Sequence, residues 1–232
     1  KVRFYKRPQV TITEIVKPIF SNVVAPKTQS GIINGIAQNP VGGTWLVDEG
    51  RVVFSSFKEL ILNPYAWYMF LHNNLASILL TGFIVLAISM FHIQKKYHAD
   101  TFKISAKIAA WVILISSVMM PITGYTYMNF IAAVQPDKIN MITNGISNSP
   151  DVSVILPIIV KTAFHTMTVL GTIFILFGLY VVVFNNKIKE SVNLKKISLF
   201  MIPLPYVAII TGWMVAEMGR QPWIIYNMMK VS

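Results

Sequence analysis

Four long apolar segments constrain the fold of this chain more than any other feature of its sequence. They run from about Tyr65 to Ile93, from Ile104 to Tyr125, from Val152 to Phe184 and from Ile197 to Met218. Each reaches the roughly 20 predominantly apolar residues that an α-helix needs to cross a bilayer. The sequence therefore predicts an all-α integral membrane protein with four transmembrane helices in a bundle.

The composition agrees with a membrane protein and excludes several other classes. Only 12% of the 232 residues are charged, about half the fraction of an average soluble domain. The net charge of +11 comes with no basic helix face, so nucleic acid is not indicated as a partner. The absence of cysteine excludes disulfides, thiolate metal sites and Fe–S clusters. No Ser/His/Asp set or glycine-rich phosphate loop favours a hydrolase or a nucleotide-binding protein.

Lysines between the apolar segments predict the orientation in the membrane. They lie between the first and second segments and between the third and fourth: Lys95, Lys96, Lys103 and Lys107, then Lys187, Lys189, Lys195 and Lys196. The loop from Thr126 to Asp151 has one lysine, Lys138. By the positive-inside rule both lysine-rich connections are cytoplasmic, and the loop that contains Lys138 faces outward.

Residues 1–62 differ from the rest of the chain. Their composition is mixed, and Lys17 and Lys27 interrupt the only stretches that could cross a bilayer. We expect an irregular extension on the outer face, with one strand near Val10 to Ile15. Residues 63–226 then form the transmembrane domain, and residues 227–232 form a short tail.

Ionisable residues inside the spans are candidate functional groups, because they are costly in a membrane. His72 lies in the first span and could either bond to a neighbouring helix or bind a haem iron within the bundle. His165 and Met167 lie in the third span, and a His/Met pair ligates some low-spin haems. Methionine is also a common apolar filler. Residues two apart on a helix point in different directions, so spacing alone does not choose between them.

The end of the fourth span holds a second group of candidates. Glu217 could pair with Arg220 three residues later. Alternatively it could be a weak carboxylate ligand to a high-spin iron, or an acid that handles protons. Trp213 and Trp223 are typical of an interfacial aromatic belt.

Several ordered blocks of sequence resemble one known family. They are NGIAQNP at 34–40, FKELILNP at 57–64, QPDK at 135–138, AFHTM at 163–167, IPLPY at 202–206 and GWMVAEMGRQPW at 212–223. Together, over roughly residues 33–226, they resemble subunit I of cytochrome bd quinol oxidase. The GRQPW block is highly specific.

The resemblance implies roles for individual residues. His72 and Met167 fall on the two axial ligands of a low-spin haem b that accepts electrons from quinol. Glu217 falls on the carboxylate associated with a high-spin haem b, which a partner chain would share. Lys138 falls on a lysine implicated in quinol binding. Arg220 suits a haem propionate through its donor fork, and Trp213 and His165 complete the cofactor-binding candidates.

Departures from the family pattern limit what the resemblance implies. The first four helices and the last helix of the family have no counterpart here. Thr143 replaces an acidic residue of the quinol loop, and His165 replaces an arginine.

We predict a membrane haem b subunit of a bd-like quinol oxidase in the respiratory chain of a prokaryotic cytoplasmic membrane. A separate chain would supply the missing helices, so this chain would not be active alone. The alternative is a cytochrome b-type electron-transfer subunit of another respiratory complex, without oxygen reduction.

Overall fold

The computed structural model describes residues 46–48, 51–53, 58, 61–184, 192–227 and 229–230. The predicted strand near Val10 to Ile15 and the NGIAQNP block lie outside the described residues. The helices are α4 (Pro64–Gln94), α5 (Ala99–Val134), α6 (Pro136–Asn144), α7 (Ile155–Val183), α9 (Val192–Met201) and α10 (Pro203–Met218). Two short antiparallel ribbons pair β1 (Leu46–Asp48) with β2 (Arg51–Val53) and β3 (Trp223–Ile225) with β4 (Met229–Lys230).

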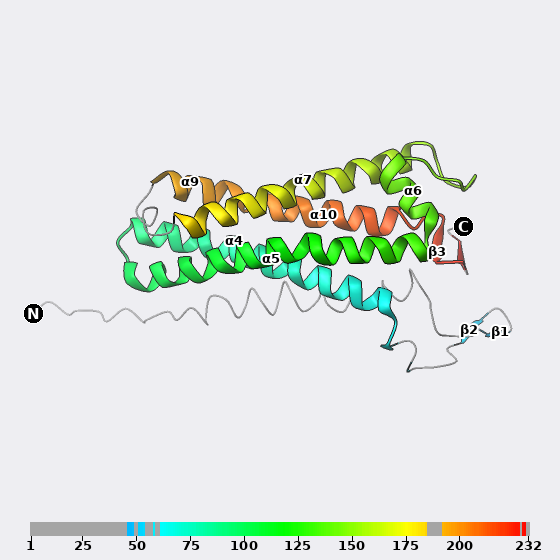
Figure 1. Cartoon of the computed structure of the whole chain (residues 1–232), viewed down its shortest axis with the longest axis horizontal. Coiled ribbons are helices and arrows are strands. Elements are labelled where there is room, and N and C mark those ends of the chain that lie inside the picture. Colours follow the sequence, from blue (N-terminus) through cyan, green and yellow to red (C-terminus); the bar gives the residue numbers. More distant parts are fainter. Residues whose placement is uncertain are drawn as a thin grey trace, which may run out of the picture.

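The four predicted spans are confirmed as helices that are long and apolar enough to cross a membrane. They lie side by side along the length of the bundle, with α6 at one end and α9 at the other (Figure 1). The fourth span consists of α9 and α10, which meet at Ile202. Pro203 and Pro205 cause this break, because proline cannot donate the backbone hydrogen bond that would continue α9 into α10.

The second span is longer than predicted. The second apolar segment was expected to end near Tyr125, yet α5 continues to Val134 with Pro121 inside it. A proline is tolerated in a membrane helix where side chains and neighbouring helices bond the freed backbone groups. Much of the predicted outer loop is therefore helical, in the end of α5 and in α6.

Close packing fills the half of the bundle away from α6. The Phe83 ring stacks on Phe177, with centroids 5.5 Å apart, and meets the edge of Phe174 at 5.2 Å. A Cβ on Gly178 would lie 3.0 Å from the Leu114 Cα, and a Cβ on Gly82 would lie 2.9 Å from the Ile113 Cγ1. Small residues at these points let α5 approach both neighbours closely.

The ends of α4 and α6 set the geometry of the opposite half. Asn63 caps α4 by accepting a hydrogen bond from the Tyr65 N–H at 3.0 Å, and Pro64 begins the helix. Gln135 separates α5 from α6, and Gly145 ends α6 in the left-handed conformation at φ 72°. This turn folds α6 back against the ends of the other helices, where it contacts α7.

Candidate functional site

A cavity of about 390 Å³ opens within the bundle, between α4, α5, α6, α7 and α10. Most of its lining is apolar, including Met69, Met128, Ile142, Phe164, Phe174 and Ile209. Four of the predicted site residues also line it: His72, Lys138, Met167 and Trp213. A mainly apolar cavity with a few convergent polar groups is typical of a cofactor site.

His72 reaches the cavity from α4, and its ring lies against α5. Its Nδ1 is 3.5 Å from the Thr123 hydroxyl oxygen. Because that hydroxyl is within donating distance of the Met119 and Met120 carbonyls, its oxygen is left to accept a hydrogen bond from the Nδ1–H. This arrangement favours the tautomer in which Nε2 is unprotonated, the form of imidazole that binds a metal. A Cβ on Gly124 would lie 3.4 Å from the His72 Cε1, so a glycine there gives the ring room.

Met167 reaches the same cavity from α7. A Cβ on Gly212 of α10 would lie 3.2 Å from the Met167 Sδ, and a Cβ on Gly171 would meet nothing within 4 Å. Gly124, Gly171 and Gly212 thus line the cavity from three different helices. Side chains at these positions would project into it, so the glycines keep open a space that a planar ring system could fill.

His165 does not line the cavity. Its side chain is exposed, and its Nδ1 lies 2.8 Å from the Lys161 carbonyl oxygen on the same helix. Residues two apart are rotated by about 200° on a helix, which explains why Met167 faces the cavity and His165 does not.

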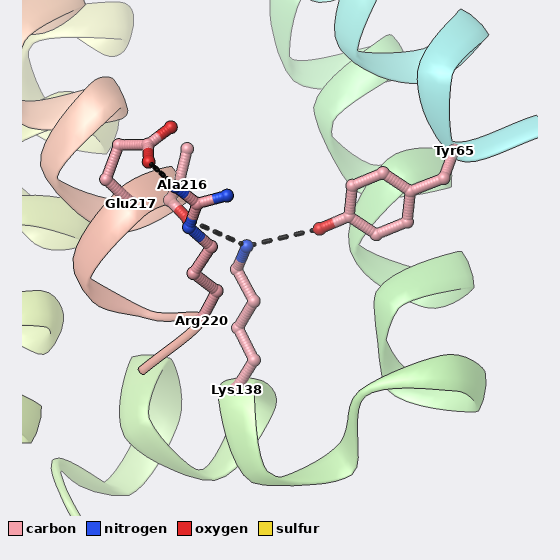
Figure 2. Close-up of polar contacts among 5 residues, drawn as sticks. All are labelled: Tyr65, Lys138, Ala216, Glu217 and Arg220. Atoms are coloured by element: carbon pink, nitrogen blue, oxygen red, sulfur yellow. Dashed lines mark hydrogen bonds and ion pairs between the residues drawn. The ribbon is translucent and has the colours of Figure 1, made fainter. Parts of the chain in front are cut away.

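Lys138 of α6 is the most deeply buried of the charged candidates, with 3% of its surface exposed. Its Nζ donates to the Tyr65 hydroxyl at 3.1 Å and to the Ala216 carbonyl at 3.3 Å (Figure 2). Burial lowers the pKa of Lys138 to about 7, while Glu217 opposes the shift and Arg220 adds to it. The amine is therefore divided between its charged and neutral forms near neutral pH.

A glycine of the GRQPW block makes room for the Lys138 side chain. A Cβ on Gly219 would lie 3.3 Å from the Lys138 Cε and 3.4 Å from its Cγ. The same Cβ would lie 2.5 Å from the Val215 carbonyl oxygen. A side chain at position 219 would therefore force α6 or the end of α10 to shift.

Glu217 and Arg220 form the ion pair that their spacing predicted. The Arg220 Nη2 lies 2.6 Å from the Glu217 Oε2. Figure 2 shows the pair beside the Lys138 amine. Neither residue lines the cavity, whereas Trp213, one turn before Glu217 on α10, does.

Sequence reasoning missed two tyrosines of this site. Tyr65 is fully buried and accepts the hydrogen bond from Lys138, and its hydroxyl is also hydrogen-bonded to that of Tyr127. Tyr127 lines the cavity from α5. One signal was available, because Tyr65 lies seven residues before His72 and therefore on the same face of the first span.

These features define a class of protein: a membrane helix bundle with an internal, mainly apolar cavity that a histidine and a methionine line together. The chain matches the family described as cytochrome bd terminal oxidase subunit I, over residues 31–162 and 144–232. It belongs to this family. The predicted family and the predicted all-α membrane fold are therefore confirmed.

Individual relatives agree with this assignment. Cytochrome bd ubiquinol oxidase subunit 1 of Bacillus subtilis (strain 168) is 24% identical over 259 residues, covering 86% of this chain and 54% of the relative. Cytochrome bd-II ubiquinol oxidase subunit 1 of Escherichia coli (strain K12) is 35% identical over 69 residues, covering 29% of this chain and 13% of the relative. This chain thus spans about half the length of the Bacillus relative.

A solved structure, the bd oxidase from Geobacillus thermodenitrificans, has the same fold. It superposes with a TM-score of 0.74 at 18% identity, covering 97% of this chain and 63% of that one.

Proposed function

We propose that this chain is the haem b subunit of a bd-like quinol oxidase, with His72 and Met167 as the axial ligands of a low-spin haem. The observation that carries the proposal is the placement of these two side chains on opposite helices, α4 and α7, around one glycine-lined cavity. In the described part of the chain, no three His, Cys, Asp or Glu side chains could hold a bare metal ion together. An iron here would take its other ligands from a porphyrin.

The side chains of this chain would position such a group and tune it. A hydrogen bond from the His72 Nδ1 to the Thr123 hydroxyl oxygen would leave Nε2 to bind iron. A thioether ligand raises the reduction potential relative to a second imidazole, and the apolar lining excludes water from the site. When bound, a haem supplies one-electron chemistry between a quinol and the next acceptor.

We further propose that quinol approaches from the α6 end of the cavity, where Lys138 is the buried polar group. Because the connection between α4 and α5, with Lys95 and Lys96, lies at the other end of the bundle, this end would face outward. Arg220 and Glu217 lie beside it. Arg220 would bind a haem propionate, and Glu217 would bind a second, high-spin haem shared with a partner chain.

We also propose that a partner membrane chain supplies the helices that reduce oxygen. The alternative, an electron-transfer subunit without oxygen reduction, shares the same His72/Met167 site and differs only in this partner.

A difference spectrum of the tagged, purified complex tests the haem site. We expect a low-spin haem b signal that His72→Ala and Met167→Leu each convert to high spin or abolish. His165→Ala is the matched control, because this exposed histidine lies on the same helix as Met167 but outside the cavity. An unchanged low-spin spectrum in an assembled His72→Ala complex would contradict the proposal.

A further inference from the structure

Two lysines that lie far apart in the sequence meet at one aromatic ring, at the end of the bundle opposite α6. The Lys95 Nζ, at the end of α4, lies 4.4 Å from the centroid of the Phe91 ring, and the Lys195 Nζ of α9 lies 5.1 Å from the same centroid. The helices α4 and α9 contact each other at this end, beside the connection from α4 to α5 (Figure 1). Packing of two separate spans therefore brings both ammonium groups to one place.

The nearby carboxylate does not neutralise these two charges. Asp100, the acid of the connection between α4 and α5, pairs with Lys103 at 3.2 Å. Within the described residues, no salt bridge joins Lys95 or Lys195 to a carboxylate. The Phe91 ring attracts each ammonium but carries no net charge. An anion bound to both ammonium groups would offset the repulsion between them.

The orientation of the spans does not explain this arrangement. The positive-inside rule requires lysines on the cytoplasmic side of the membrane, but it does not require two of them from separate spans to meet at one ring. Their sequence neighbours Lys96 and Lys196 show the ordinary arrangement. Both are exposed, and neither lies over an aromatic ring of the described residues.

An exposed apolar surface lies one helical turn further along α9. Leu199 follows Lys195 by four residues and Phe200 follows Lys196 by four, so each apolar side chain shares a helix face with a lysine. Leu199 is 44% exposed and Phe200 is 72% exposed. Because the fourth span begins with α9 at this end, these two side chains lie deeper in the membrane than the lysines. They are at the level of acyl chains, and the lysines are at the level of lipid headgroups.

We propose that Lys95 and Lys195 bind the phosphate of an anionic phospholipid, whose acyl chains lie against Leu199 and Phe200. A phosphodiester offers oxygen acceptors to the ammonium donors of both lysines. Basic pockets between membrane helices on the cytoplasmic side are typical binding sites for such headgroups. Neither lysine lines the central cavity, so this site does not depend on the haem.

Native mass spectrometry of the complex, purified in detergent through a tag on this chain, measures the binding of individual lipids. The complex is titrated with phosphatidylglycerol and separately with zwitterionic phosphatidylcholine that has the same acyl chains. We expect the wild type to bind phosphatidylglycerol more tightly. Lys95→Gln/Lys195→Gln should weaken the binding of phosphatidylglycerol about tenfold or more and leave that of phosphatidylcholine unchanged.

The chain offers a matched control and a reserve. Lys96→Gln/Lys196→Gln removes the same charge from adjacent exposed positions and leaves the pair at Phe91 intact, so it should bind phosphatidylglycerol as the wild type does. The single variants Lys95→Gln and Lys195→Gln should each weaken this binding severalfold, which keeps the test available if the double variant does not assemble.

Three results would overturn the proposal. Equal weakening by the two double variants would indicate a diffuse positive surface instead of a site. Displacement of phosphatidylglycerol by millimolar inorganic phosphate would assign the site to free phosphate instead of a lipid. A wild-type complex that does not prefer phosphatidylglycerol would also contradict it, including one in which an acidic segment of a partner subunit covers Lys95 and Lys195.

Discussion

Replacing the buried Lys138 with methionine should remove a pH dependence of stability that the lysine creates. Burial lowers the pKa of Lys138 from 10.5 to about 7, while the unfolded chain keeps the ordinary value. Between these two values the unfolded state binds one proton more than the folded state. The wild-type protein is therefore destabilised by the buried charge at low pH and becomes more stable as pH rises from 7 towards 10.5.

The size of this effect follows from the same two pKa values. Each pKa unit corresponds to about 1.36 kcal/mol, so the full difference is about 5 kcal/mol. Between pH 7 and pH 8.5 the wild-type protein should gain about 1.5 to 2 kcal/mol relative to Lys138→Met. For a chain of this size that corresponds to roughly 3–8 °C in Tm.

Thermal unfolding of the purified complex in detergent, at several pH values, measures this difference. Subtracting the Tm of Lys138→Met at each pH removes the contribution of every other titrating group. The hydrogen bonds lost from Lys138 to Tyr65 and Ala216 change the offset between the two proteins, but not its dependence on pH. A difference that stays constant from pH 6 to pH 8.5 would refute the description of Lys138 as a buried amine with a lowered pKa.

Three other perturbations have defined outcomes. Met167→His should retain a low-spin haem at a lower potential in a redox titration, because imidazole stabilises ferrous iron less than a thioether does; a raised potential would contradict Met167 as a ligand. Gly212→Leu should reduce the haem content of the purified complex, because the side chain would begin 3.2 Å from the Met167 Sδ; full haem content would show that the cavity is not the haem site. Glu217→Gln should lower the unfolding free energy by no more than about 1 kcal/mol, since its ion pair is partly exposed; a loss of several kcal/mol in a thermal scan would argue against this.

The sequence predicted the spans because the length of an apolar run is a direct requirement of the bilayer. It did not predict the extent of α5, since Pro121 signals a helix end in water but is tolerated within a membrane helix. The break at Ile202 was not predicted either, because the fourth segment was taken as one span from Ile197 to Met218, although Pro203 and Pro205 coincide with the start of α10.

The candidate site was predictable only in part. The cost of burying ionisable groups identified His72 and Glu217. The family resemblance favoured Met167 over His165 and added Lys138. Spacing could not decide whether His165 or Met167 faces the cavity, because that depends on the rotation of α7 against its neighbours. The contact between Lys138 and Tyr65 joins residues 73 positions apart, and it exists only because α6 folds back over the ends of α4 and α10.

The identity of the axial ligands is the most direct test of the central claim. Near-infrared magnetic circular dichroism of the oxidised, purified complex distinguishes a His/Met haem from a bis-histidine haem or a high-spin haem. Ligation by His72 and Met167 predicts a His/Met signature in the wild type that becomes bis-histidine in Met167→His and is unchanged in His165→Ala. A bis-histidine signature in the wild type would contradict ligation by His72 and Met167. Loss of the wild-type signature in His165→Ala would contradict it as well.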